Sequence, residues 1–179
     1  MIDKQEKRRG KEPRIACRLA VNRAAAHLTM GNYQTAKEYL EGIDTSLLSE
    51  KDGSLLIYTI NLILCLYELG NIEEAEQLFE TNLVKLSPIG KRLRKSVELL
   101  IGERYYFLGK YDLSYEHLNK LCNRDLEQRQ YLGVLFRLAQ MELMKGETEQ
   151  AIKKLKKVER FGNKLWITKA SRDLLENIS

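Results

Sequence analysis

The side chains that could bind a metal or act as nucleophiles are few and lie far apart in the chain. They are two histidines and three cysteines, namely His27, His117, Cys17, Cys65 and Cys122. No two cysteines have the short spacing of a zinc or redox site. The motifs H-E-x-x-H, G-x-S-x-G, G-x-x-x-x-G-K-[ST] and G-x-G-x-x-G do not occur in the sequence. We therefore expect no enzyme activity, no metal and no cofactor, and three reduced thiols of the kind found in cytoplasmic proteins.

Positive charge is the second feature that suggests a binding function, because lysine and arginine side chains bind phosphate groups. The chain carries a formal net charge of +5. Residues 1–14 contain six basic and three acidic side chains, which gives this segment a charge of +3 by itself. The segment also lacks apolar periodicity, so we expect a flexible leader over residues 1–14.

A second basic run, A-I-K-K-L-K-K-V-E-R, occupies residues 151–160. Its apolar members recur at helical spacing, which leaves the lysines on the outward face of a helix. We interpret that face as solvent-exposed, and contact with a phosphate backbone is the alternative. The run lacks the interleaved aromatic residues that usually bind single-stranded nucleic acid.

The secondary structure that carries these residues is predicted to be helical. The chain has 179 residues but two prolines, and leucine, glutamate, lysine and alanine are abundant, which favours helix. The most apolar run lies at residues 54–69 and contains an asparagine, a threonine and a glutamate. It is short for a membrane span, which needs ~20 residues, and is predicted to be a buried helix.

A repeat organises these helices around four glycines. Gly31, Gly70, Gly109 and Gly146 are separated by 39, 39 and 37 residues. Each is predicted to end one helix in the left-handed conformation that glycine adopts readily. Five positions after each glycine stands a small residue, namely Ala36, Ala75, Ser114 and Ala151. Seven positions before the glycine the residue is also small in three pairs, as Ala24, Gly102 and Ala139, whereas the second pair has Ile63. This pattern predicts four antiparallel helix pairs, which must stack to bury their apolar stripes.

The pattern resembles the tetratricopeptide repeat, most fully in I-G-E-R-Y-Y-F-L-G-K-Y-D-L-S-Y-E-H-L. That segment carries the family's order of residues at Ile101, Gly102, Tyr105, Gly109, Tyr111, Ser114 and Leu118. The period exceeds the family's 34 residues, and the family's tryptophan is absent from the first helices. The resemblance implies an all-α, right-handed α-solenoid of about four helix pairs over residues 15–162. A capping helix over 163–179, containing Trp166, is expected to cover the last pair.

In arrays of this family the first helix of each pair lines a concave face, and the resemblance implies which residues lie there. They are Ile57, Ile60, Leu64, Tyr67, Leu99, Glu103, Tyr106, Phe107, Phe136, Gln140 and Leu143. Most are apolar or aromatic, which is typical of a binding surface. We expect a groove that binds a partner peptide or an amphipathic helix, as in an adaptor or scaffold. Self-association as a homodimer and internal packing of these side chains are the alternatives.

Two other functions remain open at the level of sequence. The chain could be a basic accessory protein on RNA or DNA, acting through residues 4–14 and 153–160. It could also be the soluble tail of a larger membrane-anchored or regulatory protein. Of these readings we favour a cytoplasmic protein that binds another protein, and we expect neither nucleic acid nor a membrane as its partner.

Overall fold

The computed structural model describes residues 11–82, 90–122 and 126–178, and within these ranges it contains nine α-helices, one short 3-10 helix and no strand. The prediction of an all-α protein is therefore confirmed. The chain divides into two compact units, Met1–Val97 and Glu98–Ser179, and the boundary falls inside one helix. Residues 1–10 of the expected leader lie outside the described residues, whereas 11–14 begin the first described helix.

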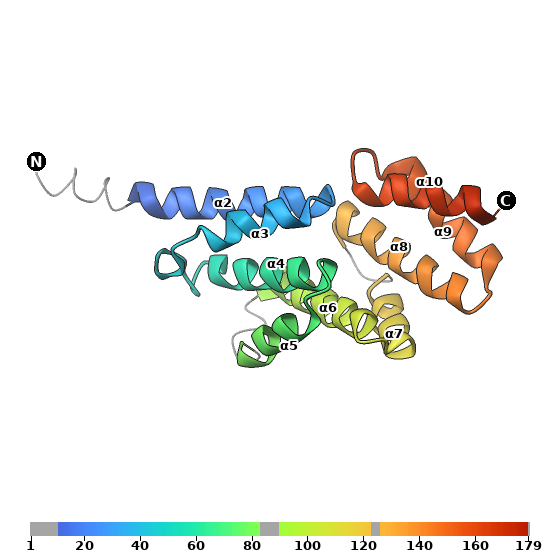
Figure 1. Cartoon of the computed structure of the whole chain (residues 1–179), viewed down its shortest axis with the longest axis horizontal. Helices are drawn as coiled ribbons and strands as arrows, with labels where there is room; N and C mark the ends of the chain where they lie inside the picture. Colours follow the sequence, from blue (N-terminus) through green and yellow to red (C-terminus); the bar gives the residue numbers. More distant parts are fainter. Residues whose placement is uncertain (1–10, 83–89, 123–125, 179) are drawn as a thin grey trace, which may run out of the picture. The chain divides into compact units, whose positions relative to one another are not determined.

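The helices of the first unit and the one that crosses the boundary are, in chain order, α2 (Lys11–Thr29), α3 (Tyr33–Glu41), η1 (Thr45–Leu47), α4 (Ser54–Glu68), α5 (Ile72–Thr81) and α6 (Gly90–Phe107). The second unit continues with α7 (Tyr111–Cys122), α8 (Gln128–Met144), α9 (Thr148–Phe161) and α10 (Trp166–Ile178). Helices that follow each other in the chain pack together from α2 to α5 in the first unit and from α7 to α10 in the second (Figure 1). No helix in the described part of the chain has the length and apolar character needed to cross a bilayer.

The four anchor glycines adopt one turn geometry. Their φ angles are 77°, 79°, 71° and 77°, which confirms the predicted left-handed conformation. At each turn the residue after the glycine donates its backbone N–H to the carbonyl five residues earlier, over 2.9 Å in all four cases; the pairs are Asn32 to His27, Asn71 to Leu66, Lys110 to Tyr105 and Glu147 to Glu142. This bond defines a Schellman turn, which satisfies carbonyls at the end of the first helix.

The small residues of the repeat lie where the two helices of a pair approach each other. Ala36, Ala75, Ser114 and Ala151 are each fully buried. In the third pair Ser114 Oγ donates a hydrogen bond of 2.8 Å to the Gly102 carbonyl. A Cβ atom added at Gly102 would overlap the Leu118 side chain. Glycine at this position is therefore required by close packing of α6 on α7.

The core of the first unit is apolar and is shared by α2, α3 and α4. It contains Val21, Ala24, Ala36, Leu40, Ile43, Leu48 and Cys65. The run at residues 54–69 forms the buried helix α4, as predicted, and Ile63 and Leu66 on it are almost fully inaccessible. Burial raises the pKa of the Cys65 thiol to about 12.

Among its described residues the second unit has two clusters of buried apolar side chains, and α10 covers one of them. That cluster contains Leu132, Leu135, Phe136, Ala139, Ala151, Leu155, Val158 and Ile167. The Trp166 ring packs edge-on against Phe136, with ring centroids 5.2 Å apart. Trp166 therefore packs on the last helix pair, as predicted, and α10 covers that pair.

Candidate functional site

A buried arginine on α8 organises the most distinctive side-chain cluster of the second unit. Arg137 is 6% exposed, and its Nη2 and Nε atoms lie 2.6 and 2.8 Å from Glu103 Oε2 on α6. Its Nη1 atom also donates a hydrogen bond of 3.0 Å to Gln140 Oε1. A buried charge is expensive unless it is paired, and these partners provide the pairing.

Two aromatic rings lie against the same guanidinium group, and a third ring contacts one of them. Arg137 Cζ lies 4.0 Å from the centroid of the Tyr106 ring and 5.1 Å from that of Phe107, within the range of cation–π attraction. Tyr106 is in edge-to-face contact with Phe107 and with Tyr111, and both centroid distances are 5.5 Å. We call Tyr106, Phe107, Tyr111 and Arg137 the aromatic–arginine cluster.

The cluster reaches the surface at the start of α7. Tyr111 is 40% exposed, and Tyr106 and Phe107 are half-buried. Next to Tyr111, Asp112 forms an ion pair with Lys145 across 2.7 Å, which brings the start of α7 to the end of α8. The residues that flank this ion pair include Leu113 and Met144, which are 50% and 58% exposed. Apolar and aromatic surface is thus concentrated at this end of the unit.

A second buried charge on α8 is Glu142, which is fully inaccessible. Its Oε1 atom accepts hydrogen bonds from Tyr115 OH at 2.9 Å and from Lys154 Nζ at 2.5 Å. Its Oε2 atom is buried and has no hydrogen-bond partner among the described residues. Burial, together with the hydrogen bond to Glu142, raises the pKa of Tyr115 to about 12. This carboxylate therefore joins α7, α8 and α9.

Three of the residues expected in the groove are buried instead of lining a surface, which corrects the expectation for them. Tyr67 is 1% exposed, and its hydroxyl donates to the Glu76 carboxylate on α5. This bond holds the ring between α4 and α5. Ile60 is 5% exposed, and Phe136 is 2% exposed beneath Trp166.

The remaining expected groove residues are half-buried. In the first unit Ile57 packs against the α2–α3–α4 core, and Leu64 is half-buried on α4. In the second unit Leu99 and Leu143 pack against separate apolar clusters. Glu103, Tyr106, Phe107 and Gln140 come together around Arg137. Sequence reasoning missed Arg137, although a lone arginine in the otherwise apolar stretch L-G-V-L-F-R-L-A was a usable signal.

The histidines and cysteines remain dispersed in the structure. His27 stacks on Tyr39 with a centroid distance of 5.4 Å, and His117 hydrogen-bonds the Glu98 carbonyl at 2.9 Å. Cys65 is buried, and burial also raises the pKa of Cys122. In the described ranges no three side chains of His, Cys, Asp or Glu gather in a way that could hold a metal ion.

Comparisons of the chain with models of protein families, with curated proteins and with solved structures gave no match.

Proposed function

We propose that the protein is an adaptor or scaffold that binds a partner peptide or helix through the aromatic–arginine cluster. The observation that carries the proposal is the partial exposure of three rings in mutual contact, Tyr106, Phe107 and Tyr111, of which the first two lie against a guanidinium group that is already positioned. Tyrosine and arginine are enriched among residues that dominate binding energy, and a fixed side chain loses little entropy on binding.

The repeated turn supports a matching proposal for the architecture. Four Schellman turns at intervals of 39, 39 and 37 residues are expected of antiparallel helix pairs in a right-handed α-solenoid similar to the tetratricopeptide repeat. Repeats of that kind present their first helices to a partner. The first helices of the third and fourth pairs would be α6 and α8, which carry Tyr106, Phe107 and Arg137.

The partner that suits this surface is an amphipathic helix or an extended segment with large apolar side chains. The patch offers Tyr111, Leu113 and Met144 as exposed apolar area. Arg137 is occupied by Glu103, so a partner would meet the aromatic rings rather than a free guanidinium group. The affinity would then depend on how well the apolar face of the partner helix fits the rings and on the apolar area that it buries.

The test compares two tyrosines with matched surroundings. Tyr111 and Tyr39 are 40% and 37% exposed, and each contacts one aromatic ring, Tyr106 or His27. Wild type, Tyr111→Ala and Tyr39→Ala are each expressed in the organism that the protein comes from. The proteins cross-linked to each of the three are then quantified by mass spectrometry. We expect wild type and Tyr39→Ala to share a partner that Tyr111→Ala retains at least about tenfold less, the effect of losing one hot-spot side chain.

Melting curves and sedimentation velocity accompany the test. Both variants should melt within a few degrees of wild type, because both rings are partly exposed. If all three proteins retain the same partners equally, the cluster is not the binding surface. If wild type is a dimer that Tyr111→Ala dissociates, the partner is a second copy of the chain.

A further inference from the structure

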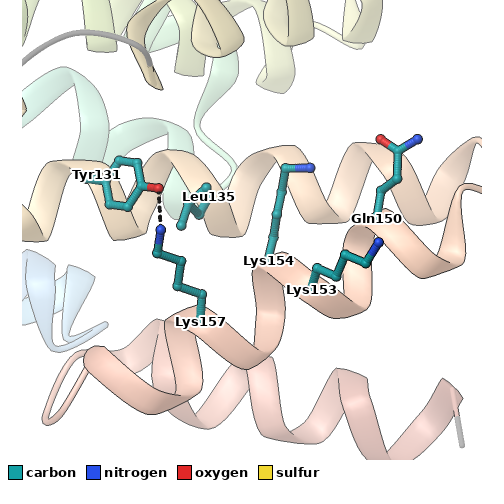
Figure 2. Close-up of a pocket in the computed structure, with 6 residues that line it drawn as sticks. All are labelled: Tyr131, Leu135, Gln150, Lys153, Lys154 and Lys157. Atoms are coloured by element: carbon teal, nitrogen blue, oxygen red, sulfur yellow. Dashed lines mark hydrogen bonds between the residues drawn. The ribbon is translucent and has the colours of Figure 1, made fainter.

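A pocket of about 290 Å³ lies between α8 and α9, entirely within the second unit, and Figure 2 shows its lining. The α8 wall is formed by Tyr131 and Leu135, which are four residues apart and so share one face of the helix. The α9 wall is formed by residues at helical spacing, Gln150, Lys153, Lys154 and Lys157. We call this the lysine pocket. Three lysine side chains of α9 thus line the pocket opposite one leucine and one tyrosine.

The three lysines differ in the hydrogen bonds and ion pairs that their ammonium groups make. Lys154 is committed to the buried Glu142 carboxylate at 2.5 Å. Lys157 Nζ donates to Tyr131 OH at 2.7 Å and lies 4.8 Å from the centre of that ring (Figure 2). Lys153 is exposed and makes no hydrogen bond or ion pair with any residue in the described ranges. After Glu142 neutralises Lys154, two positive charges, on Lys153 and Lys157, remain in the pocket.

These two charges occupy adjacent turns of one helix face. Residues four apart on a helix are neighbours, about 6 Å apart at Cβ, and like charges at that spacing repel each other. Leu135, which is 6% exposed, forms an apolar floor beside them. A dianion placed between Lys153 and Lys157 would remove the repulsion and receive two charge-assisted hydrogen bonds.

We propose that the lysine pocket binds a phosphate group of a small phosphorylated molecule. Lysine suits phosphate as a mobile point charge, and the two uncompensated lysines match the charge of a phosphate monoester. A nucleic-acid strand would need rings on which bases can stack. The one ring in the pocket, Tyr131, already lies against the Lys157 ammonium group. A compact phosphate therefore fits the pocket better than a stacked strand, and none of its lining residues belongs to the aromatic–arginine cluster.

The experiment is a calorimetric titration of the full chain with pyrophosphate and with inorganic phosphate at constant ionic strength. Wild type should bind pyrophosphate saturably, with one site per chain. The double variant Lys153→Gln, Lys157→Gln should bind at least about tenfold more weakly, as expected for losing charge-assisted hydrogen bonds. The matched control is Lys156→Gln, which removes the same charge from an exposed position of α9 outside the pocket lining and should bind like wild type.

Two single variants of Lys153 test whether its charge is what binds pyrophosphate. Lys153→Gln alone removes a side chain without described polar contacts, so it should leave the melting temperature unchanged and still weaken binding. Lys153→Arg should restore binding, because it keeps the charge. The proposal is overturned if no saturable binding occurs, or if Lys156→Gln weakens binding as much as the double variant. It is also overturned if a single-stranded oligonucleotide binds through Lys153 and Lys157 while pyrophosphate does not.

Discussion

Helices α4 and α8 occupy equivalent places in the repeat but bury different kinds of side chain. Nine residues before the turn glycine α4 has Asn61 and α8 has Arg137, and all but a small fraction of each is buried. Four residues before the glycine α4 has Leu66 and α8 has Glu142, which are 1% and 0% exposed. The two helices share one turn geometry, so the backbone of the repeat tolerates either uncharged or ionic side chains in its interior.

The neighbouring helices determine which kind of side chain a repeat position can bury. Arg137 is buried because α6 supplies Glu103 and Tyr106, and Glu142 is buried because α7 and α9 supply Tyr115 and Lys154. On α4 the Asn61 Nδ2 atom has no hydrogen-bond partner among the described residues. Buried ion pairs often contribute little net stability, but losing one partner is costly.

The largest predicted effect is on stability, and it differs between leucine substitutions at the equivalent positions of α4 and α8. Arg137→Leu would leave the Glu103 carboxylate, whose side chain is 18% exposed, without its main partner. We expect a loss on the order of 3 kcal/mol in the free energy of unfolding, measured by urea denaturation. Asn61→Leu is the matched variant, and the third pair already has Leu100 at this position, where it is fully buried. That variant should be neutral or slightly stabilising, because it removes an unsatisfied polar atom. Equal destabilisation by both variants would show that the two helices do not differ in this way.

The next effect concerns two glycines in the first helices of neighbouring pairs. Gly102→Ala should destabilise the protein by about 1–3 kcal/mol, because its Cβ would overlap the fully buried Leu118. Gly133→Ala on α8 has open space around the new Cβ. It should stabilise the protein by about 0.5–1 kcal/mol through helix propensity. Thermal melts of both variants provide the measurement, and shifts of the same sign would contradict this account of helix spacing.

A smaller and more uniform effect is expected at the turns. Gly70 and Gly146 both have positive φ, and neither has an atom within 4 Å of an added Cβ. Alanine at either position should therefore lower the free energy of unfolding by about 1–2 kcal/mol through backbone strain alone. Gly70 lies in the first unit and Gly146 in the second. If the two costs differ several-fold in urea denaturation, the turns are not energetically equivalent.

The smallest effect is a dependence on alkaline pH through Tyr115. The folded-state pKa of about 12 lies above the usual value of 10, so folding favours the neutral phenol. The resulting stability is fully present below pH 10 and is lost as the pH rises from 10 to about 12. Tyr115→Phe should lose less stability over that range than wild type. The difference between the two proteins isolates Tyr115 from Cys65, whose pKa is also raised to about 12.

The sequence was sufficient to predict the features that depend on backbone and side-chain size. The left-handed glycines, the small residues between paired helices, the buried run at residues 54–69 and the helix around Trp166 were all predicted and observed. These features are local, because each follows from residues a few positions apart.

The features that sequence reasoning missed depend on which distant side chains meet. Glu76 draws Tyr67 into the α4–α5 interface, and Glu103 and Tyr106 allow α8 to bury Arg137. Tyr131 meets Lys157 across 26 positions of sequence, so the basic run acquires an aromatic neighbour that its own residues lack. Periodicity identifies the face on which a side chain lies, but it does not identify the partner that approaches from another helix.

The four turns of one geometry imply a single helix–turn–helix unit that is repeated along the chain. Amide hydrogen exchange followed by NMR is the measurement that checks this repetition. The backbone N–H groups of Asn32, Asn71, Lys110 and Glu147 follow the turn glycines and each donates over 2.9 Å into the preceding helix. Although they lie in exposed turns, we predict that all four exchange slowly, as hydrogen-bonded amides do. Exchange at the rate of an unstructured peptide at any of the four would contradict the claim, because that turn would lack the bond that defines the repeat.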